Sequence, residues 1–172
     1  MSDLIKGYNI NNIKFWTIIF FAVLIFLSAV SSVMAGQGGG VAIIINKSNP
    51  IDDISLRTLE MILKQEQQYW KFGDRITLLM QKSGSPEKTL VLEKIYNMTD
   101  QQLKEFWIKK MVREDIPSFP KTLDSNEAVK LFVEKIPSAI GFIDSKYVDN
   151  TIKVLLIDGK KAGFSGYILN NE

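Results

Sequence analysis

The amino-acid sequence predicts an α/β domain of three layers, in which helices flank a mostly parallel β-sheet on both faces. First, Val41–Ile45 is an unbroken apolar run of strand length, which is typical of a strand covered on both sides. Second, strand-like segments alternate along the chain with segments whose apolar residues recur at helical spacing. Together the two patterns place helices above and below one sheet.

Four segments are expected to form the strands. Val41–Ile45 is followed by residues 75–80, and later by residues 139–143 and 153–157, each rich in β-branched or other apolar residues. A helical segment lies between the first two strands. We therefore expect a βαβ unit with parallel strands and a right-handed connection.

Four helices are expected between these strands, each with a start signal. Ser55 and Ser85 are placed as N-caps, and a proline and an acid follow Ser85 directly. Thr99 begins a capping box, because glutamine stands three residues later. The last helix begins at Asp124 or Ser125.

Residues 1–35 predict export. Lys6 and Lys14 precede an uncharged apolar run over residues 15–30, and Val33 and Ala35 supply the small or apolar positions of a cleavage site. The alternative is an uncleaved membrane anchor, which needs about 20 apolar residues. In both cases the rest of the chain is expected in the periplasm or cell envelope, in contact with the membrane only through this segment if it is retained.

The domain boundaries follow from this division. Residues 1–35 are the signal peptide or anchor, residues 36–40 are a glycine-rich flexible leader, and residues 41–172 are the folded domain. The 137 residues that follow residues 1–35 are enough for one domain with a sizeable core.

Composition excludes several functions. The sequence has neither cysteine nor histidine, so disulfides, thiolate metal sites and serine–histidine or cysteine–histidine catalysis are excluded. A net charge of +2 over 172 residues gives little attraction for nucleic acid. Acidic residues are not paired at a spacing that argues for hydrolysis. We therefore expect that the chain is not an enzyme and that it binds no cofactor, no metal and no nucleic acid.

One loop, residues 83–88, carries the chemistry of an anion site. It lies where a predicted strand ends and a helix begins, so unpaired backbone N–H groups and the positive end of the helix dipole face a ligand. Gly84 permits a close backbone approach, Ser83 and Ser85 carry hydroxyl groups, and Lys88 adds positive charge. The same residues also describe an ordinary capped helix, so these residues alone leave both readings open.

In addition, the chain resembles the substrate-binding proteins of phosphate ABC transporters, and specifically one lobe of this type II periplasmic binding protein fold. The similarity covers residues 41–158 and lies in five pieces: VAIIINKSNPI, SLRTLEMIL, QYWKFGDRITLL, SGSPEK and PSAIGFI. The resemblance implies that Ser83, Gly84, Ser85 and Lys88 contact phosphate or a related oxyanion.

The chain departs from that family's pattern in two respects. Lys88 stands at an arginine, Pro86 at a glycine and Glu87 at a threonine, which removes an N–H donor and a bidentate contact. The chain also has the length of one lobe, whereas these proteins close two lobes over the ligand. The resemblance implies a solute-binding-like domain associated with phosphate uptake or sensing. The alternative is an envelope adaptor or sensor module that recognises a protein partner.

Overall fold

A computed structural model describes residues 39–171 of the chain, and the predicted export segment, residues 1–35, lies outside this part. The strands are β1 (Val41–Ile45), β2 (Asp53–Ile54), β3 (Thr77–Gln81), β4 (Lys121–Leu123), β5 (Ala139–Asp144), β6 (Lys153–Val154) and β7 (Leu156–Ile157). The helices are α2 (Leu56–Leu63), α3 (Pro86–Val91), the π-helical turn η2 (Leu92–Tyr96), α4 (Asp100–Val112), α5 (Asn126–Lys135) and the short 3₁₀ turn η3 (Ser145–Tyr147).

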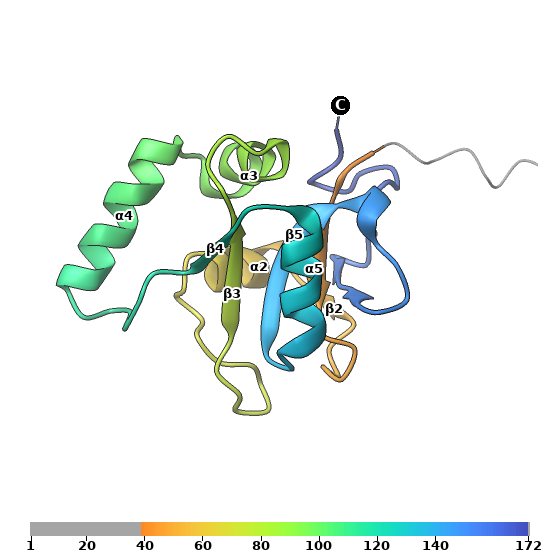
Figure 1. Ribbon diagram of the computed structural model, residues 1–172, viewed down its shortest axis with the longest axis horizontal. Coiled ribbons are helices and arrows are strands. Elements are labelled where there is room, and N and C mark those ends of the chain that lie inside the picture. Colours follow the sequence, from red (N-terminus) through yellow and green to blue (C-terminus); the bar gives the residue numbers. More distant parts are fainter. Residues whose placement is uncertain (1–38, 172) are drawn as a thin grey trace, which may run out of the picture. The chain divides into compact units, whose positions relative to one another are not determined.

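The main sheet has five strands in the order β4-β3-β5-β1-β6 (Figure 1). β3 pairs in parallel with both β4 and β5, whereas β1 pairs antiparallel with β5 and β6. Four strands therefore run in one direction and β1 runs against them, which confirms the mostly parallel sheet. The carboxyl ends of β3, β4 and β5 meet at one edge, and this edge carries the candidate site.

The predicted parallel βαβ unit is wrong, because β1 runs opposite to β3 and β5 separates the two strands. All five residues of β1 are buried, as the apolar run predicted. A strand covered on both faces fits a sheet in either direction, so its side chains carry no signal for which direction it takes.

Side chains on the two faces of the sheet belong to two separate apolar clusters. On one face Ile43 and Ile45 join residues of α2, α3 and α4, and on the other Ala42 and Ile44 join Val129 and Val133 of α5. Figure 1 shows α5 lying over β5. This arrangement confirms the three layers. Both clusters consist of residues between 41 and 169, so the described part has a hydrophobic core of its own.

The predicted strand 153–157 is divided at Leu155. Val154 still pairs with Ile44 of β1, but Leu156 pairs with Asp53, so that β7 and β2 form a separate two-stranded parallel sheet. Leu155 itself donates its backbone N–H to the carbonyl of Ile43 at 2.9 Å. β2 and β4 were not predicted, because two or three residues are too few to show a period.

Both ends of the described part lie together. The N–H of Val41 donates to the carbonyl of Leu169 at 2.8 Å, and the N–H of Asn171 donates to Gly39 at 2.9 Å. The buried hydroxyl of Tyr167 donates to the Val41 carbonyl at 3.0 Å. The C-terminal tail thus packs against the start of β1. Over residues 39–171, every helix is too short or too polar to cross a bilayer.

Candidate functional site

The predicted anion loop follows β3 at the carboxyl edge of the sheet, beside α3 (Figure 1). Lys82 donates its backbone N–H to the Leu123 carbonyl at 2.9 Å, which fixes the loop to the end of β4. Gly84 has φ 81°, in the left-handed region that glycine adopts without strain. The chain can therefore reverse sharply before α3 begins.

Ser85 caps α3 as the sequence predicts. Its hydroxyl oxygen accepts the Lys88 N–H at 3.2 Å, and its carbonyl accepts the Thr89 N–H at 3.0 Å. Pro86 occupies the first helical position and has no N–H to offer. The start of α3 is largely satisfied within the chain, so Ser85 has a structural role and the backbone of this helix leaves few donors for a ligand.

The other three predicted residues converge on a group that was not predicted, the carboxylate of Asp100 at the start of α4. The ammonium of Lys88 lies 2.7 Å from Asp100 Oδ1 and 3.2 Å from Ser83 Oγ. The Ser83 hydroxyl and the Gly84 backbone N–H lie close enough to the Asp100 carboxylate to lower its pKa. We call Ser83, Gly84 and Lys88 the cradle; the cradle binds an oxyanion that belongs to its own chain.

The protonation of Asp100 agrees with this arrangement. Its partial burial acts to raise the pKa of the carboxyl group, but the Lys88 ammonium, the Ser83 hydroxyl and the Gly84 N–H together lower the pKa below its ordinary value. Asp100 is therefore a carboxylate at neutral pH. The positive charge of the almost fully buried Lys88 is compensated by this one internal anion.

Asn126, the first residue of α5, connects the site to the sheet. Its side-chain oxygen accepts hydrogen bonds from Gln81 Nε2 at 2.8 Å and from the Asp144 N–H at 2.9 Å. Its side-chain nitrogen donates to Glu87 Oε1 at 2.8 Å. Gln81 and Glu87 are buried, so Asn126 joins β3, β5 and α3 through groups that water does not reach well.

α5 starts at the same edge, and acidic side chains of the chain itself also complement the positive end of its helix dipole. The Ser125 hydroxyl oxygen caps α5 by accepting the Ala128 N–H at 3.2 Å. The pKa of Glu127 is lowered by its own backbone N–H and by Ser125. With Asp100 and Glu87 nearby, acidic groups complement the starts of both helices. An external anion gains little attraction here unless one of them moves away.

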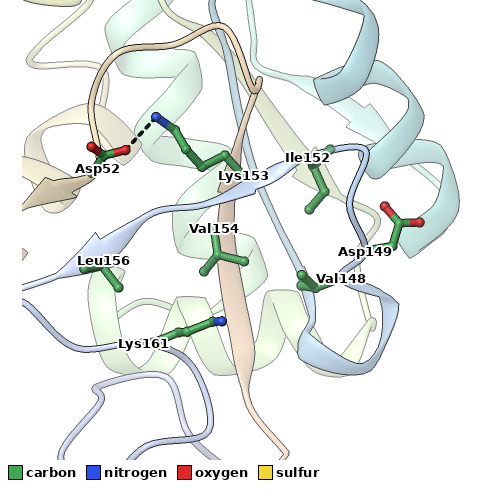
Figure 2. A pocket seen from close by; sticks show the side chains of 8 residues that line it. All are labelled: Asp52, Val148, Asp149, Ile152, Lys153, Val154, Leu156 and Lys161. Atoms are coloured by element: carbon green, nitrogen blue, oxygen red, sulfur yellow. Dashed lines mark hydrogen bonds and ion pairs between the residues drawn. The ribbon is translucent and has the colours of Figure 1, made fainter.

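A separate groove of about 420 Å³ lies beside β6 (Figure 2). Val148, Ile152 and Val154 form its apolar wall. Lys153 on its rim pairs with Asp52 at 2.8 Å, and Asp149 pairs with Lys130 at 2.7 Å. None of the predicted site residues lines it. The groove is therefore distinct from the cradle.

The sequence did not reveal Asp100 or Asn126 as site residues. Thr99 and Gln102 correctly marked the start of α4, with both capping-box hydrogen bonds present. That signal places Asp100 at the first position of a helix but does not show that its side chain reaches back to Lys88.

Over residues 39–171 there is no group of three or more acidic side chains that could hold a metal ion.

No protein-family model matches the sequence. Solved structures do match. A phosphate ABC transporter substrate-binding protein from Clostridium perfringens, solved with bound phosphate, is similar with a TM-score of 0.59 and 22% identity, over 74% of this chain and 49% of that protein. An ABC-type phosphate transport receptor from Vibrio cholerae has a TM-score of 0.57 and 17% identity, over 74% of this chain and 50% of the receptor. PstS from Borrelia burgdorferi has a TM-score of 0.57 and 19% identity, over 72% of this chain and 52% of PstS.

At these identities the similarity establishes the fold. The described domain has the fold of phosphate ABC transporter substrate-binding proteins, which confirms the resemblance seen in the sequence at that level. This chain spans about half the length of the proteins that it matches. What those proteins bind bears on this chain only as a proposal.

Proposed function

We propose that this chain is an exported solute-binding-like domain that recognises phosphate or a related oxyanion at residues 83–88. The observation that carries the proposal is the contact of the Lys88 ammonium with the Asp100 carboxylate at 2.7 Å, with the Ser83 hydroxyl and the Gly84 N–H beside them. A set of donors that binds a carboxylate oxygen suits an oxygen of phosphate or sulfate equally well. The fold shared with phosphate-binding proteins supports the same proposal.

Binding at this half-site is expected to be weak. One ammonium, one hydroxyl and one backbone N–H face the anion, and a single lobe leaves its other side to water. A dissociation constant on the order of 1 mM corresponds to about 4 kcal/mol, a reasonable value for so few contacts. At ten times that concentration the anion would stabilise the fold by about 1.4 kcal/mol.

The test is a titration of residues 36–172 with phosphate, sulfate and chloride at constant ionic strength, followed by the NMR signal of the Gly84 amide. Lys88→Met should abolish the saturable shift of this amide. Lys82→Met is the matched control, since Lys82 is an exposed neighbour that loses the same charge. A titration that is unchanged in Lys88→Met would contradict the proposed site.

The exported location is part of the proposal and has its own test. Fractionation of the source cells should recover the chain outside the cytoplasm. N-terminal sequencing of the recovered protein distinguishes cleavage, which gives a chain that begins at Gly36, from a retained anchor, which keeps residues 1–35. Recovery of the full-length chain in the cytoplasmic fraction would contradict export.

We also propose that the domain binds without catalysis. Its fold is shared with transport proteins, and the sequence offers no histidine or cysteine for acid–base or nucleophilic steps. Purified protein should therefore release no phosphate from phosphate esters. Turnover that is lost on Ser83→Ala or Lys88→Met would contradict this proposal.

An envelope adaptor is the second candidate, and one observation favours it. On α4, Val112 is 79% exposed and Ile108 is 44% exposed, and Phe119 in the following loop is 50% exposed. Ile108 and Val112 are four residues apart on α4 and so lie side by side, and exposed apolar neighbours of this kind occur at protein contact sites. A photo-crosslinker at position 112 should then capture one specific envelope protein, while the same group at Lys64, after α2, should not. Equal labelling from both positions would argue against an adaptor.

A further inference from the structure

We propose that Asp100 is an intramolecular ligand of the cradle, which keeps it closed until an external oxyanion displaces the Asp100 carboxylate. This inference rests on the proposed function and adds to it a regulation of the same site. The chain's own carboxylate and a free anion would compete for the same three donors.

Burial makes an internal anion necessary. The Lys88 side chain is only 10% exposed, whereas that of Asp100 is 38% exposed. An ammonium group so far from water needs a counter-charge, which the Asp100 carboxylate supplies. Because the Asp100 side chain borders solvent, a rotation about its own bonds could carry its carboxylate out without a movement of the sheet or of α3.

The Asp100 carboxylate and an external oxyanion cannot occupy the cradle at the same time. The Lys88 ammonium lies 2.7 Å from Asp100 Oδ1, so an external oxyanion at that distance from Lys88 would stand where the carboxylate now lies. Two negative groups in contact would also repel each other strongly. Binding of phosphate therefore requires that Asp100 leaves, and the measured affinity is lowered by the free energy of the internal contact.

α4 does not depend on the Asp100 side chain for its start. Thr99 and Gln102 cap the helix through two hydrogen bonds, Thr99 N–H to Gln102 Oε1 at 2.8 Å and Gln102 N–H to Thr99 Oγ1 at 3.2 Å. Leu103 and Trp107 anchor the helix in the core. A variant at position 100 should therefore keep α4 in place and leave the cradle without its internal anion.

The experiment compares the affinity of inorganic phosphate and of sulfate for wild-type residues 36–172, Asp100→Asn and Asp100→Ala, read from the Gly84 amide. Glu105→Gln is the matched control, because it removes one acidic charge from the same helix at an exposed position. Both Asp100 variants should bind phosphate at least about tenfold more tightly than the wild type, equivalent to about 1.4 kcal/mol. Glu105→Gln should bind as the wild type does.

A second measurement follows the Asp100 carboxyl carbon of the wild type during the same titration. Its NMR signal should move in proportion to the Gly84 signal as the carboxylate leaves Lys88. Equal phosphate affinity in the wild type and in both Asp100 variants, or a saturated Gly84 signal with an unmoved Asp100 signal, would overturn the competition while the proposed oxyanion site stood. Absence of saturable binding in every variant would overturn both.

Discussion

Replacement of Asn126 by aspartate exchanges the side-chain NH2 group for an oxygen atom, at the centre of the polar network that supports the site. The side-chain oxygen that accepts from Gln81 and from the Asp144 N–H can remain in place. The nitrogen that donates to Glu87 Oε1 at 2.8 Å becomes an oxygen with no proton to donate. Asn126→Asp therefore brings two carboxylates together at a position where Glu87 is buried.

The magnitude follows from three contributions. A hydrogen bond to a charged group is worth about 1.5–3 kcal/mol, and the buried Glu87 carboxylate would then lack this partner. Repulsion between the carboxylates adds to the loss, whereas a negative charge at the first position of α5 recovers about 0.3–1 kcal/mol from the helix dipole. We expect a net destabilisation of about 2–4 kcal/mol, or a fall in Tm of roughly 6–15 °C for a domain of this size.

The assay is urea and thermal unfolding of residues 36–172 in four forms: wild type, Asn126→Asp, Glu87→Gln and the double variant. Glutamine at position 87 can donate to the new aspartate, so the double variant should be more stable than Asn126→Asp alone. If the two single effects add within about 0.5 kcal/mol, the direct contact between these side chains is not what stabilises the network.

Three further predictions concern the core, the tail and the cradle. Gly141→Ala would place its Cβ 2.7 Å from Val129 Cγ1, so urea unfolding should show a loss of about 1–3 kcal/mol, in part recovered by Val129→Ala in the same chain; no loss would show that α5 moves away freely. Tyr167→Phe removes the hydroxyl that donates to the Val41 carbonyl and should cost about 1 kcal/mol in thermal unfolding, and an unchanged Tm would mean that the tail does not hold β1. The folded state lowers the pKa of Asp100. The ionised Asp100 carboxylate therefore stabilises the fold above its ordinary pKa of about 4, and this stabilisation is lost as the pH falls through the lower pKa of the folded state. On acidification the free energy of unfolding of the wild type should decline more than that of Asp100→Asn, and parallel curves would contradict this.

Local signals in the sequence predicted local structure well. Ser85 and Thr99 were placed as helix caps, and in the structure each hydroxyl oxygen accepts the backbone N–H three residues later. The last helix was placed at Asp124 or Ser125, and Ser125 is its cap. Such contacts are decided within one helical turn, so the sequence contains all that is needed to predict them. The three-layer fold followed in the same way from burial of β1 on both faces.

Contacts between distant residues could not be predicted. Nothing in the apolar run of β1 indicates its antiparallel direction, and nothing in residues 153–157 indicates that Leu155 would pass from one sheet to another. The same holds at the site. Lys88 and Asp100 are brought together by the path of η2 and the turn before α4, and Asn126 reaches Glu87 only because β3 and β4 are neighbours.

The pairing of Gly39 and Val41 with the C-terminal tail also bears on how the domain could be rearranged. Since both ends of the described part leave from adjacent backbone positions, a short linker could join them. New ends could then be opened at the exposed turn around Gly73, which has φ 100° and open space about it. Such a circular permutant would keep every contact of the cradle. The order in which the elements follow one another along the chain is therefore separable from the geometry that positions Lys88 and Asp100.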